Sequence, residues 1–179
     1  MSRLTVTPDT TPGQPELRSE EPNVIAHALS TIGVRFERWE APVAVDPEAP
    51  SEVILDAYRP HLDALMGPSG AGSADVLRLR PGNEAYPAMR QKFLDEHIHT
   101  EDEVRFFVQG GGHFILHKDG LVYDAFCIAG DLISVPSGIR HWFDAGLEPH
   151  ATVLRIYTDT TGWTPHYTGD KISALFPAS

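Results

Sequence analysis

Three histidines and one glutamate are the residues of this chain whose types and spacing best suit chemistry. His97, His99 and Glu103 lie in the run HIHTEDE, and His141 lies in SGIRHWF. Imidazole nitrogens with a single carboxylate suit iron, nickel, cobalt, manganese or zinc, and four ligands leave an octahedral ion two positions for substrate. A structural zinc would normally be enclosed by cysteines. The set therefore predicts a catalytic divalent metal.

The spacing of these residues fits strands. Side chains alternate across a strand, so His97 and His99 would point to the same side. Glu103 and Arg105 are also an even number of residues away and would face the same side if no bulge intervenes. His141 falls on a separate predicted strand, so the metal would join two parts of a sheet and stabilise the fold. Because ligand histidines must be neutral, we expect metal affinity to fall as the pH drops through about 6.

The other histidines and the cysteine are expected to have structural roles. Six histidines lack a carboxylate at ligand spacing, namely His27, His61, His113, His117, His150 and His166. The role of His113 and His117 stays open, although the turn KDG places His117 near an exposed end. Cys127 lies in the apolar run VYDAFCIAG and is predicted to be a buried, unreactive thiol.

Bulk composition restricts the class of protein. The chain has 179 residues and is 41% hydrophobic, which fits one domain with a proper core. The net charge of -11, without a cluster of Lys and Arg, disfavours nucleic acid as a partner. No stretch approaches the roughly 20 apolar residues that cross a bilayer, and the N-terminus lacks a leader pattern. We expect a cytoplasmic protein with no membrane partner. The sequence is silent on oligomeric state, and we take the chain as a monomer.

Periodicity predicts a helical beginning followed by strands. Apolar residues have helical spacing from Val24 to Gly33 and again after Ser51, where Pro60 should kink or split the helix. A short strand is expected at 4–6. After the Gly/Ser-rich run 67–74, short β-branched and aromatic runs predict strands at 75–80, 97–99, 103–109, 113–117, 121–127, 131–135, 140–143 and 151–157. The fold class is therefore mainly β, a sandwich or barrel with helices packed outside it.

Two runs match known motifs. HIHTEDEVRFFVQG resembles the first cupin motif, and GDLISVPSGIRH, at 130–141, resembles the second. The motifs' leading glycine and final asparagine are replaced by Gln91 and Ala145, which leaves every ligand in place. Longer agreement resembles the bacterial acireductone dioxygenases; it covers GVRFERW at 33–39, the segments 92–110 and 131–144, TGW at 161–163 and TGD at 168–170.

The resemblance implies a fold and an activity. The fold would be a cupin-type double-stranded β-helix, or jelly-roll barrel, with a few flanking α-helices. We expect a single cupin domain over 1–179, with an N-terminal arm and outer helices at 1–70, the metal-bearing barrel at 75–160 and a C-terminal segment at 161–179. The activity would belong to methionine salvage, with one Fe²⁺ or Ni²⁺ per monomer, an acireductone substrate and O₂. Another metal-dependent cupin dioxygenase or isomerase, or a non-enzymatic metal-binding cupin, remains an alternative.

The resemblance also implies roles for individual residues. Family members cleave 1,2-dihydroxy-3-keto-5-methylthiopentene, and Arg105 would favour loss of its second proton; the alternative for Arg105 is a surface ion pair with Glu101, Asp102 or Glu103. Phe143, which shares the parity of His141, and Trp163, from the family match, would form an apolar wall for the substrate. Glu96 and Asp102 flank the ligands and would orient them. By resemblance, Glu96 assists metal incorporation and Asp102 relays conformational change.

Overall fold

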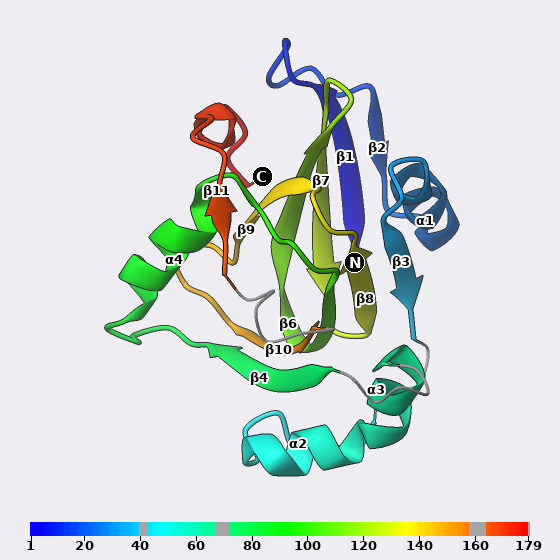
Figure 1. The fold of residues 1–179 in the computed structure, drawn as a ribbon, viewed down its shortest axis with the longest axis vertical. Helices are drawn as coiled ribbons and strands as arrows, with labels where there is room; N and C mark the ends of the chain where they lie inside the picture. Colours follow the sequence, from blue (N-terminus) through cyan, green and yellow to red (C-terminus); the bar gives the residue numbers. More distant parts are fainter. Residues whose placement is uncertain (40–42, 67–71, 158–163, 179) are drawn as a thin grey trace.

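The computed structural model describes residues 1–39, 43–66, 72–157 and 164–178. Its strands curl around a common interior, with helices on the outside (Figure 1). The helices are α1 (Pro22–Ser30), α2 (Ser51–Ala57), α3 (Arg59–Met66), α4 (Tyr86–Leu94) and the 3₁₀ helix η2 (Ile172–Leu175). The strands are β1 (Arg3–Pro8), β2 (Leu17–Ser19), β3 (Arg35–Arg38), β4 (Ser73–Leu79), β5 (His97–Ile98), β6 (Glu103–Lys118), β7 (Leu121–Ile128), β8 (Asp131–Val135), β9 (Arg140–Asp144), β10 (Ala151–Tyr157) and β11 (His166–Tyr167).

The long strand β6 joins two antiparallel sheets. Its first half, at 103–110, pairs with β10 and β8, and β4 and β3 extend that sheet at its two edges. Its second half, at 111–118, pairs with β7 and β9 in a sheet that continues to β1 and β2 on one side and to β5 and β11 on the other. The prediction of a mainly β barrel with flanking helices is confirmed.

Several elements differ from the sequence predictions. The strands expected at 103–109 and 113–117 are one continuous strand, because three glycines let the chain pass from one sheet to the other without a turn. The helix after Ser51 is split in two at Tyr58, and Pro60 lies in the first turn of α3, where no backbone N–H is required. Helix α4 and strands β2, β3 and β11 were not predicted.

Packing accounts for the position of the helices. An apolar core lies between the sheets and includes Phe107, Phe114 and Val153. Helices α2 and α3 cover the outer face of the first sheet through Ile54, Tyr58 and Leu62, which pack with Phe106 and Leu132; Figure 1 shows both helices beside β4. The predicted burial of Cys127 is confirmed, and burial raises the pKa of its thiol well above the usual value.

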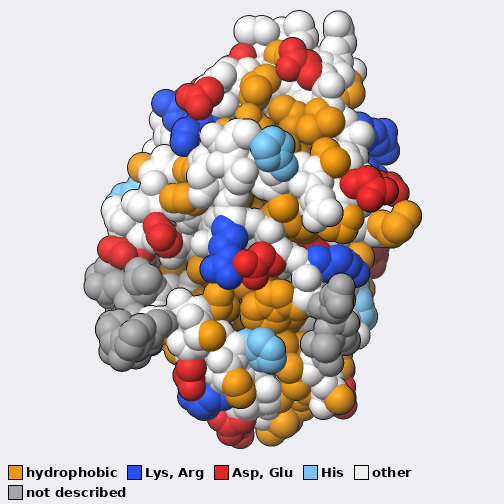
Figure 2. Space-filling model, turned by 90° about the vertical axis from the view of Figure 1, so that its right-hand side faces the viewer, with side chains coloured by type: hydrophobic (Ala, Val, Ile, Leu, Met, Phe, Trp, Pro, Cys, Tyr) orange, Lys and Arg blue, Asp and Glu red, His pale blue; other side chains and the backbone are white. Residues whose placement is uncertain are grey.

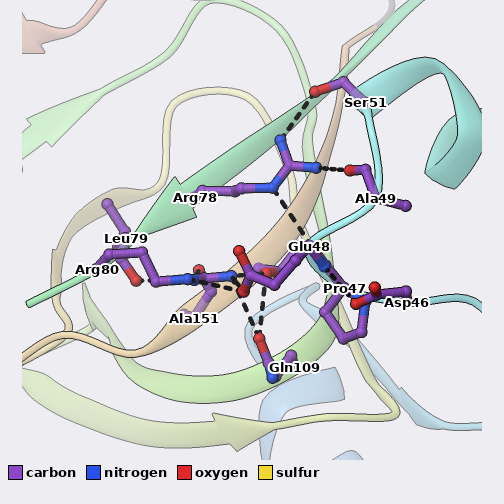
Figure 3. A network of polar contacts seen from close by, with 11 residues as sticks. Asp46, Pro47, Glu48, Ala49, Ser51, Arg78, Leu79, Arg80, Gln109 and Ala151 are labelled. Atoms are coloured by element: carbon purple, nitrogen blue, oxygen red, sulfur yellow. Dashed lines mark hydrogen bonds and ion pairs between the residues drawn. The ribbon is translucent and has the colours of Figure 1, made fainter.

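Two arginines attach the segment before α2 to the barrel (Figure 3). Arg78, on β4, donates to Ser51 Oγ at 3.0 Å and to the carbonyl oxygens of Pro47 and Ala49. Arg80 pairs with Glu48 and also donates to Thr152 Oγ1 at 2.7 Å on β10. These contacts fix the helical layer against the outer edge of the first sheet.

Charges of both signs share the surface. On the face drawn in Figure 2, Lys and Arg side chains lie next to Asp and Glu, with apolar patches between them, and no basic patch gathers there. Within the described ranges, no helix has the length and apolar character needed to cross a bilayer.

Candidate metal centre

The structure brings the four predicted ligands together. His97 and His141 are direct cross-strand partners on β5 and β9, while His99 follows β5 and Glu103 begins β6. Ligand nitrogens of the three imidazoles all lie within 4.8 Å of one another. Glu103 Oε2 lies 3.1 Å from Nε2 of His99 and 3.1 Å from Nε2 of His141. All four side chains are buried.

Backbone carbonyl groups orient the three imidazoles. Each ring directs Nδ1 at a carbonyl oxygen; the pairs are His97 with Asp95 at 2.7 Å, His99 with Thr164 at 3.2 Å and His141 with Ile139 at 2.8 Å. A carbonyl oxygen only accepts, so Nδ1 carries the proton in each neutral ring and Nε2 carries a lone pair. The two Nε2 atoms nearest Glu103 therefore present lone pairs to a carboxylate oxygen.

This arrangement leaves buried polar atoms in need of a cation. Glu103 Oε2 and His141 Nε2 are buried and have no hydrogen-bond partner among the described residues. An unsatisfied buried polar group costs about 1–3 kcal/mol, and facing lone pairs repel. A divalent metal between these atoms would remove both penalties, and the donor set of nitrogen and carboxylate oxygen suits a transition metal. The residues present therefore fit the metal that the sequence predicts.

Two of the ligands, Glu103 and His97, already have the charge state that a metal needs. Burial opposes ionisation of Glu103, but the positive charge of Arg105 outweighs it and holds the pKa of that carboxyl well below its usual range. Burial, with a smaller contribution from His141, lowers the pKa of His97 to about 4. His97 is therefore neutral at pH 6, so its own titration lies below the pH at which we expect metal affinity to fall.

Arg105 lies between the metal ligands and Tyr157. Its guanidinium pairs with Glu103 Oε1 and donates to the hydroxyl of Tyr157 at 2.6 Å. Its Cζ atom also lies 4.9 Å from the centre of the Tyr157 ring. The ion pair considered as an alternative does form with Glu103, but it is buried rather than at the surface. Burial raises the pKa of Tyr157, so this hydroxyl stays protonated. Tyr157 was missed by the sequence analysis.

The interior faces of β6, β10 and β4 change in character along the barrel. In register order, Glu103 pairs with Tyr157, Arg105 with Arg155, and Phe107 with Val153. On β4, Asp75 pairs with Arg155 and Leu77 with Val153. A row with the metal ligand is thus followed by a row with two arginines, here called the cationic row, and then by an apolar row. Within the cationic row, Arg155 is ion-paired with Asp75. These rows line a cavity of about 230 Å³ that the ligand histidines also border.

Aromatic side chains from the second sheet and α4 complete the cavity. Phe143 lines it, as does Phe93, and their ring centres lie 6.2 Å apart. The ring of Phe114, another lining residue, lies 5.8 Å from that of Phe143. Phe93 comes from α4, which the sequence analysis did not find. Trp163, the other residue expected in the apolar wall, lies outside the described residues.

Glu96 and Asp102 contact neighbours other than the ligand imidazoles. Glu96 Oε2 lies 2.8 Å from Nδ1 of His117, and Glu96 Oε1 accepts from Thr168 Oγ1 at 2.6 Å. His117 Nε2 lies 3.3 Å from a carboxylate oxygen of Asp9, and the His117 side chain is only 11% exposed. His117 does lie next to the exposed hairpin turn at 118–120, as expected, but these contacts largely bury its own side chain.

Asp102 and His113 occupy hydrogen-bonded positions outside the cavity lining. Asp102 accepts from the backbone N–H of Ser137 at 2.9 Å and so ties the loop before β6 to the segment before β9. His113 Nδ1 lies 2.7 Å from an Asp124 carboxylate oxygen. Both contacts hold strands in place, and neither reaches the ligand nitrogens.

The chain is similar to known proteins over most of its length. The ARD/ARD′ family matches residues 3–165. "Acireductone dioxygenase" of Granulibacter bethesdensis is 63% identical over 179 residues, 100% of both chains, and that of Acidiphilium cryptum is 57% identical over 100% of this chain and 99% of its own. The structure of an acireductone dioxygenase from Bacillus anthracis, with a cadmium ion in its active centre, superimposes with a TM-score of 0.79 and 28% identity over 93% of this chain and 98% of that one. The chain belongs to the ARD/ARD′ family.

Proposed function

We propose that this protein is an acireductone dioxygenase that cleaves 1,2-dihydroxy-3-keto-5-methylthiopentene with O₂. With Fe²⁺ the products would be 2-keto-4-methylthiobutyrate and formate, and with Ni²⁺ they would be methylthiopropionate, formate and carbon monoxide. The names of the full-length relatives support this activity. The cadmium ion in the active centre of the Bacillus anthracis protein supports a divalent metal.

One observation carries the proposal. Three imidazoles whose Nδ1 atoms are held by backbone carbonyls direct their other nitrogens toward one another, with Glu103 beside them, at one end of a cavity. His97, His99, Glu103 and His141 would hold the metal, which would supply Lewis acidity and a template for the two substrate oxygens. A storage site has no need of the cations and apolar surface next to these ligands.

The cationic row would act on the head of the substrate. The substrate is a vinylogous acid, so its first hydroxyl ionises easily while the second resists. Arg105 keeps its positive charge at all working pH values, and this buried charge would favour loss of the proton from the second hydroxyl of the substrate. The hydroxyl of Tyr157, 2.6 Å from the guanidinium, would keep that charge beside Glu103 and the cavity.

The apolar row would hold the tail of the substrate. Leu77, Phe107 and Val153 lie beyond the cationic row, and Phe143 faces the same cavity. A methylthio group prefers such surroundings, since its soft sulfur favours contact with aromatic rings. This order of ligands, cations and apolar side chains matches a molecule with an anionic head and an apolar tail. Side chains around the cavity would also exclude water from the reacting carbons.

Product analysis tests the proposal. Metal-free protein is loaded anaerobically with Fe²⁺ or with Ni²⁺, acireductone and O₂ are added, and keto acid, formate and carbon monoxide are measured. We expect keto acid and formate from the iron sample and carbon monoxide from the nickel sample. A flavonol, offered as an unrelated dioxygenase substrate, should not react. Absence of O₂ consumption with acireductone in both metal-loaded samples would refute the activity.

A further inference from the structure

Gly112 lies on the interior face of the barrel but does not line the cavity. Gly112 is two residues before Phe114 on β6 and so faces the same side of the sheet. Phe114 is the cross-strand partner of Phe143. The ring of Phe143 covers Gly112: a Cβ atom added there would lie 2.5 Å from Cζ and 2.7 Å from Cε2 of that ring. Any side chain at position 112 would therefore collide with a residue of the cavity wall.

The glycine at this position is required by the ring and not by the backbone. The φ angle of Gly112 lies outside the left-handed region, so an alanine could adopt the same backbone. Its neighbour Gly110 differs, because it has a φ of 67° and an added Cβ would lie 1.6 Å from the carbonyl oxygen of His150. Gly110 is needed for the strand, whereas the absent side chain of Gly112 makes room for Phe143.

A side chain at position 112 would move the ring in a foreseeable direction. Phe143 is flanked by the rings of Phe114 and Phe93, at 5.8 and 6.2 Å between centres. Gly112 lies behind it and the cavity lies in front. Packed protein resists displacement more strongly than an open cavity does. A methyl group at Gly112 would therefore push the ring of Phe143 into the cavity that this ring lines.

We propose that Gly112 determines the length of the substrate tail that this enzyme accepts. By leaving room for the Phe143 ring to lie back against β6, it keeps open the part of the cavity that would take the methylthioethyl group. This inference rests on the proposed function, since it assigns the apolar end of the cavity to the tail of an acireductone. Gly112 acts through Phe143 and is a residue that determines specificity without contacting the reacting atoms.

Substrates of two lengths test the inference. The first has the methylthioethyl tail, and in the second a methyl group replaces that tail. For G112A we expect KM for the long substrate to rise about tenfold, a factor typical of misfit by one methyl group. KM for the short substrate and the amount of bound metal should stay as in the wild type. Val108→Ile is the control, since it adds a methylene to the same strand at a residue packed on the outer cluster; both substrates should be unaffected.

A compensating change distinguishes steric specificity from general damage. Phe143→Leu replaces the ring that collides with the new methyl group by a shorter side chain. The double variant G112A/F143L should therefore recover most of the wild-type preference for the long substrate. An unchanged ratio of long to short substrate in G112A would overturn the inference. So would a double variant no better than G112A, because the alanine would then collide with something other than Phe143.

The same pair of variants decides the matter if G112A is too unstable to purify. A double variant that folds and discriminates like the wild type would support the inference, and one as unstable as G112A would overturn it. Failure of the proposed function gives a different result, because the metal-loaded wild-type protein would then turn over neither substrate.

Discussion

The two ends of the cavity are built by different physical means. At the metal end, every ligand imidazole is held by a hydrogen bond to a backbone carbonyl, and Glu103 is ion-paired with Arg105. At the apolar end, Leu77, Phe107 and Val153 are positioned by strand register and by packing alone. Polar groups at the first end have fixed directions, whereas the second end is defined only by its volume and shape.

This difference implies two kinds of sensitivity to mutation. Removing one partner from a buried polar network leaves the other partner without compensation, which costs more than the lost contact itself. Altering an apolar wall changes the fit in proportion to the volume added or lost. We therefore expect changes at the metal end to abolish activity and changes at the apolar end to alter the choice of substrate. Substitutions at the metal end should reveal this contrast most clearly.

The largest effect is expected from Glu103→Gln. The substitution keeps the shape of the side chain but removes the charge that a metal would bind and that Arg105 pairs with. We expect bound metal to fall by more than about tenfold, because even the loss of a residue that only orients a metal ligand costs that much, and we expect turnover to fall with it. Elemental analysis and O₂ uptake measure the two effects. Glu148→Gln, at an exposed position, is the control. Full metal content in E103Q would contradict the ligand assignment.

Arg105→Met should separate catalysis from metal binding. Methionine keeps most of the apolar bulk but removes the charge proposed to favour loss of the second substrate proton. We expect kcat to fall about 10²- to 10³-fold, as for the removal of one group that stabilises developing negative charge, with most of the metal retained. Arg35→Met is the control, because Arg35 makes an exposed ion pair with Glu37. Unchanged kcat in R105M would refute the role of Arg105.

The sequence was most informative where spacing and chemistry act together. His97 and His99 are two apart, and strand parity predicted that both face one side. The chain leaves the strand at 99–102, so the condition for extending that parity to Glu103 and Arg105 is not met, although the structure does bring both residues to the site. The run at 130–141, which resembles the second cupin motif, placed His141 at the position of the remaining ligand. Polar residues in an otherwise apolar strand are conspicuous, because burying them requires partners. The metal end could therefore be predicted almost entirely from residue type and spacing.

The apolar end could not be predicted, for physical reasons. Strand β10 is buried on both faces, so alternation does not indicate which of its residues face the cavity. Leu77 and Val153 are ordinary core residues in sequence and become neighbours only through strand pairing. Helix α4, which carries Phe93, buries only Tyr86 among its residues and has a weak apolar face. The glycines at 110–112 predicted a break in β6, although the strand continues through them.

The metal-free protein should lose stability in acid through His97. Its folded pKa is about 4, against 6.5 for an unperturbed histidine. Between these values the unfolded chain binds a proton that the folded protein excludes, so the free energy of unfolding falls as the pH drops from about 6.5 to about 4 and then levels off. The shift corresponds to roughly 3 kcal/mol. Urea unfolding across this range should show the slope in metal-free wild type and a shallower one in H97Q.

A matched control and a clear negative result accompany this pH experiment. His166→Gln, at an exposed position, should leave the slope unchanged. Bound metal should protect the wild-type protein by keeping His97 neutral to lower pH. Equal slopes in wild type and H97Q would mean that burial does not lower the pKa of His97, and the polar end would then be less dehydrated than the structure indicates.

Tyr157→Phe should give the smallest effect and the sharpest test of how the metal end is organised. The phenol oxygen accepts a hydrogen bond from Arg105 at 2.6 Å, and phenylalanine keeps the ring that packs beneath the guanidinium. Loss of one hydrogen bond to a charged group costs about 1.5–3 kcal/mol, and part of this should be recovered as the guanidinium shifts toward Glu103. We therefore expect kcat to fall about tenfold, with KM and metal content unchanged. Tyr86→Phe is the control, because its hydroxyl bonds the carbonyl of Gly146 away from the cavity at 2.8 Å and its removal should lower stability alone. A raised KM with an unchanged kcat in Y157F would mean that Tyr157 acts as part of the cavity wall. A residue of the polar end would then control substrate binding and not rate, which contradicts the proposed division between the two ends of the cavity.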